Sequence, residues 1–150
     1  MLLLGTGIAF SLVFNKKQLL FSDNFIRWVL FFSVGIQGMW YGIWQIFHGK
    51  EVAASIGWAY SPFLFEVGFC NLSCGVAGIL SLKFGREYRL CLSIVYGIFL
   101  LGAAYKHLES LIVDHNFSFN NAGPIFYTDI LIPSLLLIFW VISSFLKKKH

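Results

Sequence analysis

Residues 60–113 read YSPFLFEVGFCNLSCGVAGILSLKFGREYRLCLSIVYGIFLLGAAYKHLESLIV. Two apolar runs, residues 60–82 and 88–113, flank a short turn that carries Lys83, Arg86 and Arg89. A hydrocarbon layer of about 30 Å needs about 20 residues of helix for each crossing. This stretch therefore predicts a pair of membrane-spanning helices joined by a basic turn.

Three further apolar runs lie outside this stretch, at about residues 1–21, 26–47 and 124–146. Lys16, Lys17 and Arg27 flank the gap between the first two runs, and residues 147–149 are three lysines that follow the last. The gaps on the alternate side of the chain contain Lys50 as their single Lys or Arg. Because cytoplasmic loops carry an excess of Lys and Arg, this pattern predicts five transmembrane helices, with the N-terminus outside and the C-terminus in the cytoplasm.

The first apolar run reaches Phe21 only if it passes Lys16 and Lys17, whose long side chains can snorkel toward an interface. A cleaved signal peptide has basic residues before its apolar core, whereas here they follow it. We therefore expect an uncleaved helix inserted with its N-terminus outward.

The composition indicates a membrane protein built as one domain. Of the 150 residues, 58% are hydrophobic and 12% are charged. A soluble domain of this length has too high a ratio of surface to volume to bury so much apolar surface. Five crossings with short loops use nearly the whole chain, so residues 1–150 are predicted to form a single all-α transmembrane bundle.

The net charge of +4 does not indicate a nucleic-acid-binding protein. Nine of the eleven Lys and Arg residues lie at the predicted cytoplasmic ends of spans. No basic stripe is interleaved with aromatic residues, as a nucleic-acid site requires. We expect these side chains to anchor the topology and to contact the anionic lipid heads of the cytoplasmic leaflet.

The sequence carries no motif of nucleophilic or disulfide chemistry. It contains no G-x-S-x-G, no C-x-x-C and no phosphate-binding glycine loop. Cys70, Cys74 and Cys91 all fall inside apolar runs. Three cysteines do not form a disulfide framework, so we expect small buried hydrophobic side chains.

Ionisable and polar side chains gather near the predicted outer ends of several spans. With the orientation above, counting at 1.5 Å per residue brings groups from the third, fourth and fifth spans to one outer layer. We call this set the outer polar cluster: Glu66, Asn71, His107, Glu109, Tyr127 and Asp129. Charged groups inside a bilayer are costly, so they are expected to face the interior of the bundle.

The outer polar cluster has two interpretations. One is a polar pocket, open to the outside, that binds a small solute, a proton or an ion. In that case Glu66 and Asp129 would accept the ligand or proton, and His107 would titrate near neutral pH. The other is a network of salt bridges and hydrogen bonds that holds the helices together, including a Lys106–Glu109 pair on one helix.

A metal site is the most specific version of the polar-pocket interpretation. Glu66, His107 and Asp129 are suitable ligand types for a transition metal. His107 and Glu109, however, are two residues apart and point about 200° away from one another on a regular helix. There is no E-x-x-H or H-x-x-x-H motif. We therefore predict no cofactor.

Two helix faces have a regular pattern. In the second span Gln37, Tyr41, Gln45 and His48 form a polar stripe, which either lines a path or packs against polar groups of other spans. In the third span a face of small residues predicts close packing against a neighbouring helix, within the chain or in an oligomer, with Asn71 as a hydrogen-bonding contact. The residues of that face are Gly68, Asn71, Gly75 and Gly78.

Two stretches resemble an uncharacterised family of small bacterial multi-pass membrane proteins. They are Ile56-Gly57-Trp58 followed by SPFLFEVGFCNLSCG, and YGIFLLGAAYKHLESLIVDHNFSFNNAGPIFYTDILIP, within residues 30–135. The family motifs are S-P-F-x-x-E-V-G-F-x-N-L, L-L-G-A-A with a nearby histidine, and N-A-G-P-x-x-Y-T-D-I-L. They fall here on Glu66, Asn71, His107, Tyr127 and Asp129. The resemblance implies a five-span bundle with the same outer polar cluster, and it implies no activity.

These observations lead to three hypotheses for a protein of the bacterial inner membrane. We favour a role in binding or translocating a small solute, proton or ion. The second is a membrane-embedded enzyme or redox partner that acts on a lipid or quinone. The third is a structural or assembly subunit without a site of its own.

Overall fold

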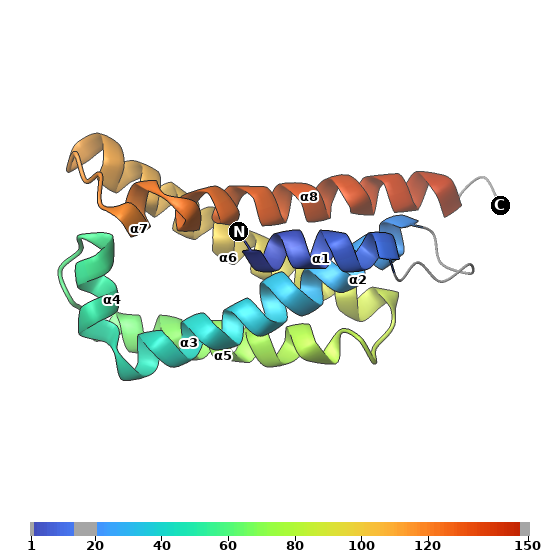
Figure 1. Cartoon of the computed structure of the whole chain (residues 1–150), viewed down its shortest axis with the longest axis horizontal. Helices are drawn as coiled ribbons and strands as arrows, with labels where there is room; N and C mark the ends of the chain where they lie inside the picture. Colours follow the sequence, from blue (N-terminus) through green and yellow to red (C-terminus); the bar gives the residue numbers. More distant parts are fainter. Residues whose placement is uncertain (1, 14–20, 148–150) are drawn as a thin grey trace.

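The computed structural model describes residues 2–13 and 21–147, and within these ranges every regular element is a helix. Most of the helices lie along one long axis (Figure 1). Expectations that concern residues 14–20 and 148–150, including Lys16, Lys17 and most of the terminal lysine run, lie outside the described residues. The elements are α1 (Leu2–Val13), α2 (Phe21–Val29), η1 (Leu30–Ile36), α3 (Gln37–Phe47), α4 (Gly49–Ile56), α5 (Phe63–Leu80), α6 (Arg86–Val113), α7 (Phe119–Ala122) and α8 (Pro124–Lys147).

Three helical segments are long and apolar enough to cross a membrane: Phe63–Leu80, Arg86–Val113 and Phe119–Leu146. The shortest has 18 residues, which at 1.5 Å per residue spans about 27 Å of hydrocarbon. The sequence predicted these three segments to within a few residues. The structure therefore supports a membrane protein, and the polar residues discussed below lie on helices of this kind.

The predicted second span is a longer and less regular helix than the sequence indicates. α2, η1 and α3 follow one another without a break from Phe21 to Phe47, and η1 is a π-helix. The helix begins five residues before the predicted boundary because its polar start is buried. Asn24 donates from its side-chain amide to the carbonyl of Ser11 at 2.7 Å.

The backbone of α5 lies almost in contact with the backbones of η1 and α3. A Cβ atom added to Gly78 would lie 2.4 Å from the backbone nitrogen of Gly35, and one added to Gly75 would lie 2.5 Å from the nitrogen of Met39. Only glycine permits so close an approach. The prediction of a close-packing face on the third span is confirmed, and its partner is a helix of the same chain.

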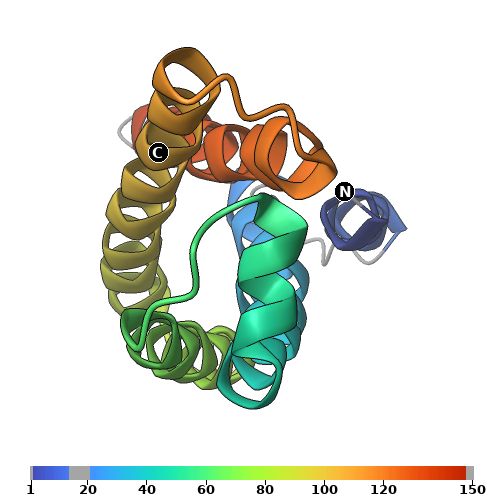
Figure 2. The same ribbon diagram turned by 90° about the vertical axis from the view of Figure 1, so that its left-hand side faces the viewer.

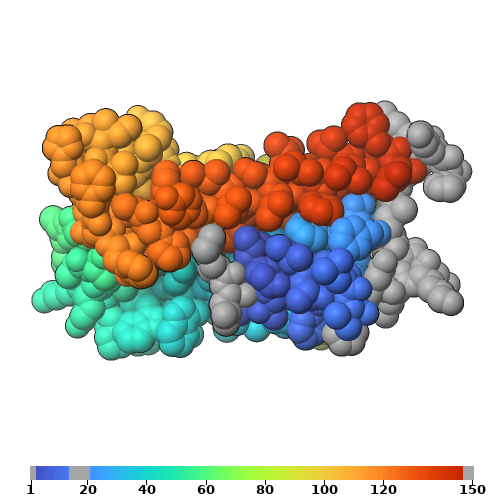
Figure 3. Space-filling model, turned by 45° about the horizontal axis from the view of Figure 1, so that its top comes forward, coloured from blue at the N-terminus to red at the C-terminus, as the bar shows by residue number. Residues whose placement is uncertain are grey.

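α1 packs on the outside of α2 and η1, on the face that Figure 3 shows. With 12 residues, its described part is shorter than α5, α6 and α8, and residues 14–20 lie outside the described residues. Leu4 of α1 joins the buried core formed by Leu30, Val34, Tyr96 and Leu136.

The two ends of the bundle differ in charge. The turn between α5 and α6, with Lys83, and the end of α8 lie at one end, which we call the basic end (Figure 1). α4 and α7 lie at the opposite end, which we call the α4/α7 end. The alternation of charge along the chain thus corresponds to a separation of charge in space.

The basic end contains a buried ion pair that the sequence analysis missed. Arg86 donates to the carboxylate of Asp23 and to the hydroxyl of Ser143, and its guanidinium lies 4.5 Å from the ring centroid of Trp140. Arg86 was expected to be a topological anchor and lipid contact, and the structure shows that it also forms this ion pair. Arg86 points inward because Asp23, which is 8% exposed, needs a positive partner.

Candidate functional site

A cavity of about 480 Å³ lies between the α3–α5 pair and the α6–α8 pair, toward the α4/α7 end. Figure 2 looks at this end and shows α4, α5, α6 and α8 arranged around the middle of the bundle. The cavity is lined by Gln37, Tyr41, Trp44, Gln45, Val52, Ile56, Trp58, Leu64, Val67, Asn71, Tyr96, Ile98, Phe99, Leu100, Gly102, Ala103, Lys106, His107, Ile125 and Asp129.

The cavity exists because the two helix pairs diverge. α3 lies tightly on α5, and α6 packs extensively on α8, whereas α5 and α6 make few direct contacts. Most of the side chains on the walls are apolar, and the polar ones come from α3, α5, α6 and α8. This composition, a mostly apolar hollow with a few convergent polar groups, is typical of small-molecule sites.

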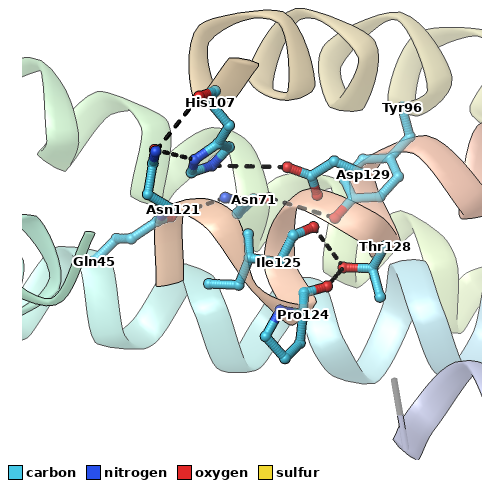
Figure 4. Close-up of polar contacts among 9 residues, drawn as sticks. All are labelled: Gln45, Asn71, Tyr96, His107, Asn121, Pro124, Ile125, Thr128 and Asp129. Atoms are coloured by element: carbon cyan, nitrogen blue, oxygen red, sulfur yellow. Dashed lines mark hydrogen bonds and ion pairs between the residues drawn. The ribbon is translucent and has the colours of Figure 1, made fainter. Parts of the chain in front are cut away.

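His107 on α6 is held by the short helix α7. Its Nδ1 lies 2.8 Å from Oδ1 of Asn121, and the histidine is 5% exposed (Figure 4). The Asn121 amide nitrogen donates to the backbone carbonyl of Asn116 at 2.8 Å and to that of His107 at 3.4 Å. The amide oxygen must therefore face the ring, so Nδ1 carries a proton and the neutral ring offers the Nε2 lone pair.

Asp129, in the second turn of α8, faces the other ring nitrogen. Its Oδ2 lies 3.9 Å from Nε2 of His107, beyond hydrogen-bond distance (Figure 4). Asp129 is 7% exposed. Among residues 2–13 and 21–147, no group donates a hydrogen bond to its carboxylate. A buried carboxylate without a donor is costly, and a bound group that supplies a donor would remove this cost.

Trp58 covers His107 on the side of the α4/α7 end. The two rings are stacked, with centroids 5.0 Å apart and planes inclined by 25°. The indole N–H donates to the hydroxyl of Ser110 at 3.1 Å, which fixes the ring. The preceding Gly57 has φ +79°, and a Cβ there would meet Asn116 and Ser118. Glycine at this position thus places Trp58 over the cavity.

Asn71 supplies a polar wall on α5. Its amide nitrogen donates to Oε1 of Gln45 at 2.8 Å, and its oxygen lies 3.5 Å from the hydroxyl of Tyr96. This contact between α3 and α5 confirms the predicted hydrogen-bonding role of Asn71. Gln37, Tyr41 and Gln45 all line the cavity, so the polar stripe of the second span lines a hollow. His48 does not line it and lies against Trp44.

The structure does not bring Glu66, Glu109 or Tyr127 into the cavity. Glu66 is exposed on α5, because its neighbours Leu64 and Val67 occupy the helix face that lines the hollow. Glu109 pairs with Lys106 at 2.8 Å on an exposed surface. Tyr127 is 52% exposed. Glu109 and Tyr127 are each two residues from an inward-facing group and hence about 200° away from it.

The outer polar cluster is therefore smaller than predicted. Of its six members, His107, Asp129 and Asn71 line the cavity. Within the described part of the chain, no three His, Cys, Asp or Glu side chains come close enough to hold a metal ion. The proposed metal ligands Glu66, His107 and Asp129 do not converge, since Glu66 points away from the other two.

The cysteines also differ from expectation. Cys70 and Cys91 are exposed and Cys74 is partly buried, and all three are free. They were expected to be buried. In a membrane-spanning bundle an apolar residue need not be covered by protein, because lipid covers it equally well.

Sequence reasoning missed three side chains that shape the site: Tyr96, Trp58 and Asn121. Tyr96 lies eleven residues before His107, three helical turns away on the same face of α6, so the helical period could have identified it. Trp58 lies between two predicted spans, and no helical pattern indicates that it covers the cavity. Asn121 is the first residue of the N-A-G-P motif, a signal that the sequence analysis did not use.

The comparisons with known proteins assign no activity to the chain. Searches of curated proteins and of solved structures give no match to the chain. The sequence model of DUF6790, described as a family of unknown function, matches residues 1–149. Because the match covers nearly every residue, the chain belongs to the DUF6790 family.

Proposed function

We propose that this chain is a five-span protein of the bacterial inner membrane with its α4/α7 end outside. In this proposal the three long apolar helices are three of the five spans. The other two are the predicted span that includes α1, and the unbroken helix from Phe21 to Phe47. The latter is long enough, at roughly 40 Å. The concentration of Lys and Arg toward the basic end supports a cytoplasmic position for that end.

The function that the geometry supports best is reversible binding of a small, mainly apolar solute in the cavity. One observation carries this proposal: a hollow of about 480 Å³ with apolar walls contains a buried carboxylate to which no described residue donates a hydrogen bond. The solute reaches the cavity from the outer side, and its polar group lies at His107 and Asp129.

A purely structural role for the cluster is less consistent with these contacts. A network that only holds helices together gains by closing its hydrogen bonds. Here the gap between Nε2 of His107 and Oδ2 of Asp129 stays at 3.9 Å, next to the hollow. Asn121 instead fixes the ring so that its free nitrogen faces the carboxylate.

Calorimetry on the purified protein in lipid nanodiscs tests this function. The probe is 2-phenylethanol, a neutral amphipathic molecule that the cavity can hold, and the quenching of tryptophan fluorescence gives a second readout because Trp44 and Trp58 line the hollow. We expect saturable binding at one site per chain. Absence of binding by this probe and by its charged analogues, 2-phenylethylamine and 3-phenylpropionate, would contradict the proposal.

Glycine positions provide a matched pair of variants. Gly102 lines the cavity, and a Cβ there meets nothing within 4 Å, so Gly102→Phe is expected to obstruct the hollow without a clash. Gly5 of α1 also has nothing within 4 Å and lies outside the cavity lining, so Gly5→Phe is the control. We expect loss of binding in the first variant and normal binding in the second. Equal binding in both would show that the probe lies elsewhere.

A further inference from the structure

The environment of Asp129 combines an unsatisfied negative group with aromatic walls. Resting on the binding function above, we infer that the cavity takes a protonated organic amine with an apolar body. The ammonium group lies against the Asp129 carboxylate, and the apolar body extends into the hollow. This assigns a chemical class to the ligand and sets the sign of its charge.

The carboxylate lacks both a hydrogen-bond donor and a close cation. His107 faces it with Nε2, the nitrogen that holds the lone pair because Asn121 engages the proton on Nδ1. Two hydrogen-bond acceptors 3.9 Å apart leave a position between them for a donor group. An ammonium group has up to three N–H donors and can reach both atoms.

Lysine does not fill this position. Lys106 lines the cavity at its rim, but its ammonium group binds the Glu109 carboxylate at 2.8 Å, and its side chain is 56% exposed. The Lys106–Glu109 ion pair therefore lies on the outside of the bundle. Within the described residues, no Lys or Arg forms an ion pair with Asp129.

Aromatic rings surround the same space and suit a cation. Tyr41 and Tyr96 line the same cavity as Asp129. Trp44, Trp58 and Phe99 complete the aromatic lining. A ring face attracts an organic cation, with the strongest effect for tryptophan, and the attraction grows in a site shielded from water.

The remaining walls determine the body of the ligand. Val52, Ile56, Leu64, Val67 and Ile125 give the hollow an aliphatic lining. These aliphatic side chains favour an amine that carries an apolar substituent. An anionic ligand would place its charge next to the carboxylate and is disfavoured by repulsion.

Three probes of similar shape test the class of ligand: 2-phenylethylamine, 2-phenylethanol and 3-phenylpropionate, which are cationic, neutral and anionic at pH 7. Calorimetry in nanodiscs of uncharged lipid measures the Kd of each, so that the bilayer itself does not concentrate the cation. We expect the amine to bind at least about tenfold more tightly than the alcohol, and the propionate most weakly.

Asp129→Asn removes the negative charge and keeps the shape. We expect it to reduce the amine-to-alcohol preference to about one. Glu66→Gln is the matched control, because it neutralises an exposed carboxylate outside the cavity, and it should leave the preference unchanged.

The outcomes separate the two proposals. Binding of all three probes with similar Kd values, or an unchanged preference in Asp129→Asn, would overturn the assignment of an amine and leave the binding function standing. Absence of binding by every probe would overturn the binding function itself. If Asp129→Asn does not yield folded protein, the Gly102→Phe variant still tests the binding function. The order of the three affinities in the natural protein then tests the assignment of an amine.

Discussion

Oδ1 of Asn121 lies 2.8 Å from Nδ1 of His107, while the amide nitrogen of Asn121 donates to two backbone carbonyls. A short helix outside the main bundle thereby fixes the tautomer of a buried histidine. The consequence is functional, because the free nitrogen Nε2 faces Asp129 and the cavity. A 180° rotation of the imidazole ring would break the hydrogen bond between Nδ1 of His107 and Oδ1 of Asn121.

This relationship predicts the protonation pattern of His107. A long-range ¹H–¹⁵N spectrum of protein labelled at histidine should show the Nδ1–H tautomer for His107 at a pH where the ring is neutral. In Asn121→Leu the restraint is gone, and the common Nε2–H form should appear. The same variant should lower the free energy of unfolding by about 1–3 kcal/mol, since it leaves a buried donor without its partner. An Nε2–H tautomer in the natural protein would contradict the assignment.

The backbone contact between η1 and α5 predicts a severe effect of one methyl group. In Gly78→Ala the new Cβ would lie 2.4 Å from the nitrogen and 2.6 Å from the Cα of Gly35, so the helices must separate. We expect a loss of roughly 1–3 kcal/mol or more, measured by thermal unfolding in detergent.

Gly102→Ala is the control for this substitution, because a Cβ there meets nothing within 4 Å. It should leave stability unchanged or raise it by up to about 1 kcal/mol through helix propensity. Equal effects of the two substitutions would show that η1 and α5 are not in close contact.

The buried ion pair at the basic end predicts strong coupling between Arg86 and Asp23. Arg86→Met removes the positive charge from a carboxylate that is 8% exposed, and should destabilise the protein by about 3–5 kcal/mol. The double variant Arg86→Met/Asp23→Asn should recover a substantial part of this loss. Lys83→Met, in the exposed turn between α5 and α6, should change stability by less than about 0.5 kcal/mol. Additive effects of Arg86→Met and Asp23→Asn would argue against the pair.

The proposed orientation predicts which positions are reachable from outside the cell. Phe119, at the start of α7, is 75% exposed, and Gly85 lies in the exposed turn at the opposite end. In a variant without native cysteines, Phe119→Cys should react with a membrane-impermeant maleimide in intact cells. Gly85→Cys should react only after the membrane is opened. The reverse pattern would invert the topology.

Helix lengths and the glycine face were predictable because each depends on a local pattern. Apolar runs of about 20 residues become helices whatever their neighbours are, as the segments around Phe63–Leu80 and Pro124–Lys147 show. The face with Gly75 and Gly78 has a helical period, and small residues at that period indicate close packing.

The membership of the polar cluster was not predictable from depth alone. Counting along spans brought Glu66, Glu109 and Tyr127 to the right level but ignored the direction in which each side chain points. The helical period already placed Glu109 opposite His107, and the same argument applied to Tyr127 and Asp129 would have removed Tyr127.

Other features depend on contacts between distant residues. Asp23 and Asn24 resemble loop residues in the sequence, yet they begin a helix because Arg86 and the carbonyl of Ser11 bind them. The π-helical segment Leu30–Ile36 carries no local signal that the sequence analysis used. The role of Asn121 depends on the fold of α7 against α6.

The most direct test of the account is an experimental structure of the protein in nanodiscs with 2-phenylethylamine at saturating concentration. The account predicts density for one molecule between α3, α5, α6 and α8, with its nitrogen within hydrogen-bond distance of Oδ2 of Asp129 and its ring beside Trp58. A cavity filled by side chains, or a bound amine found only on the outer surface of the bundle, would contradict it.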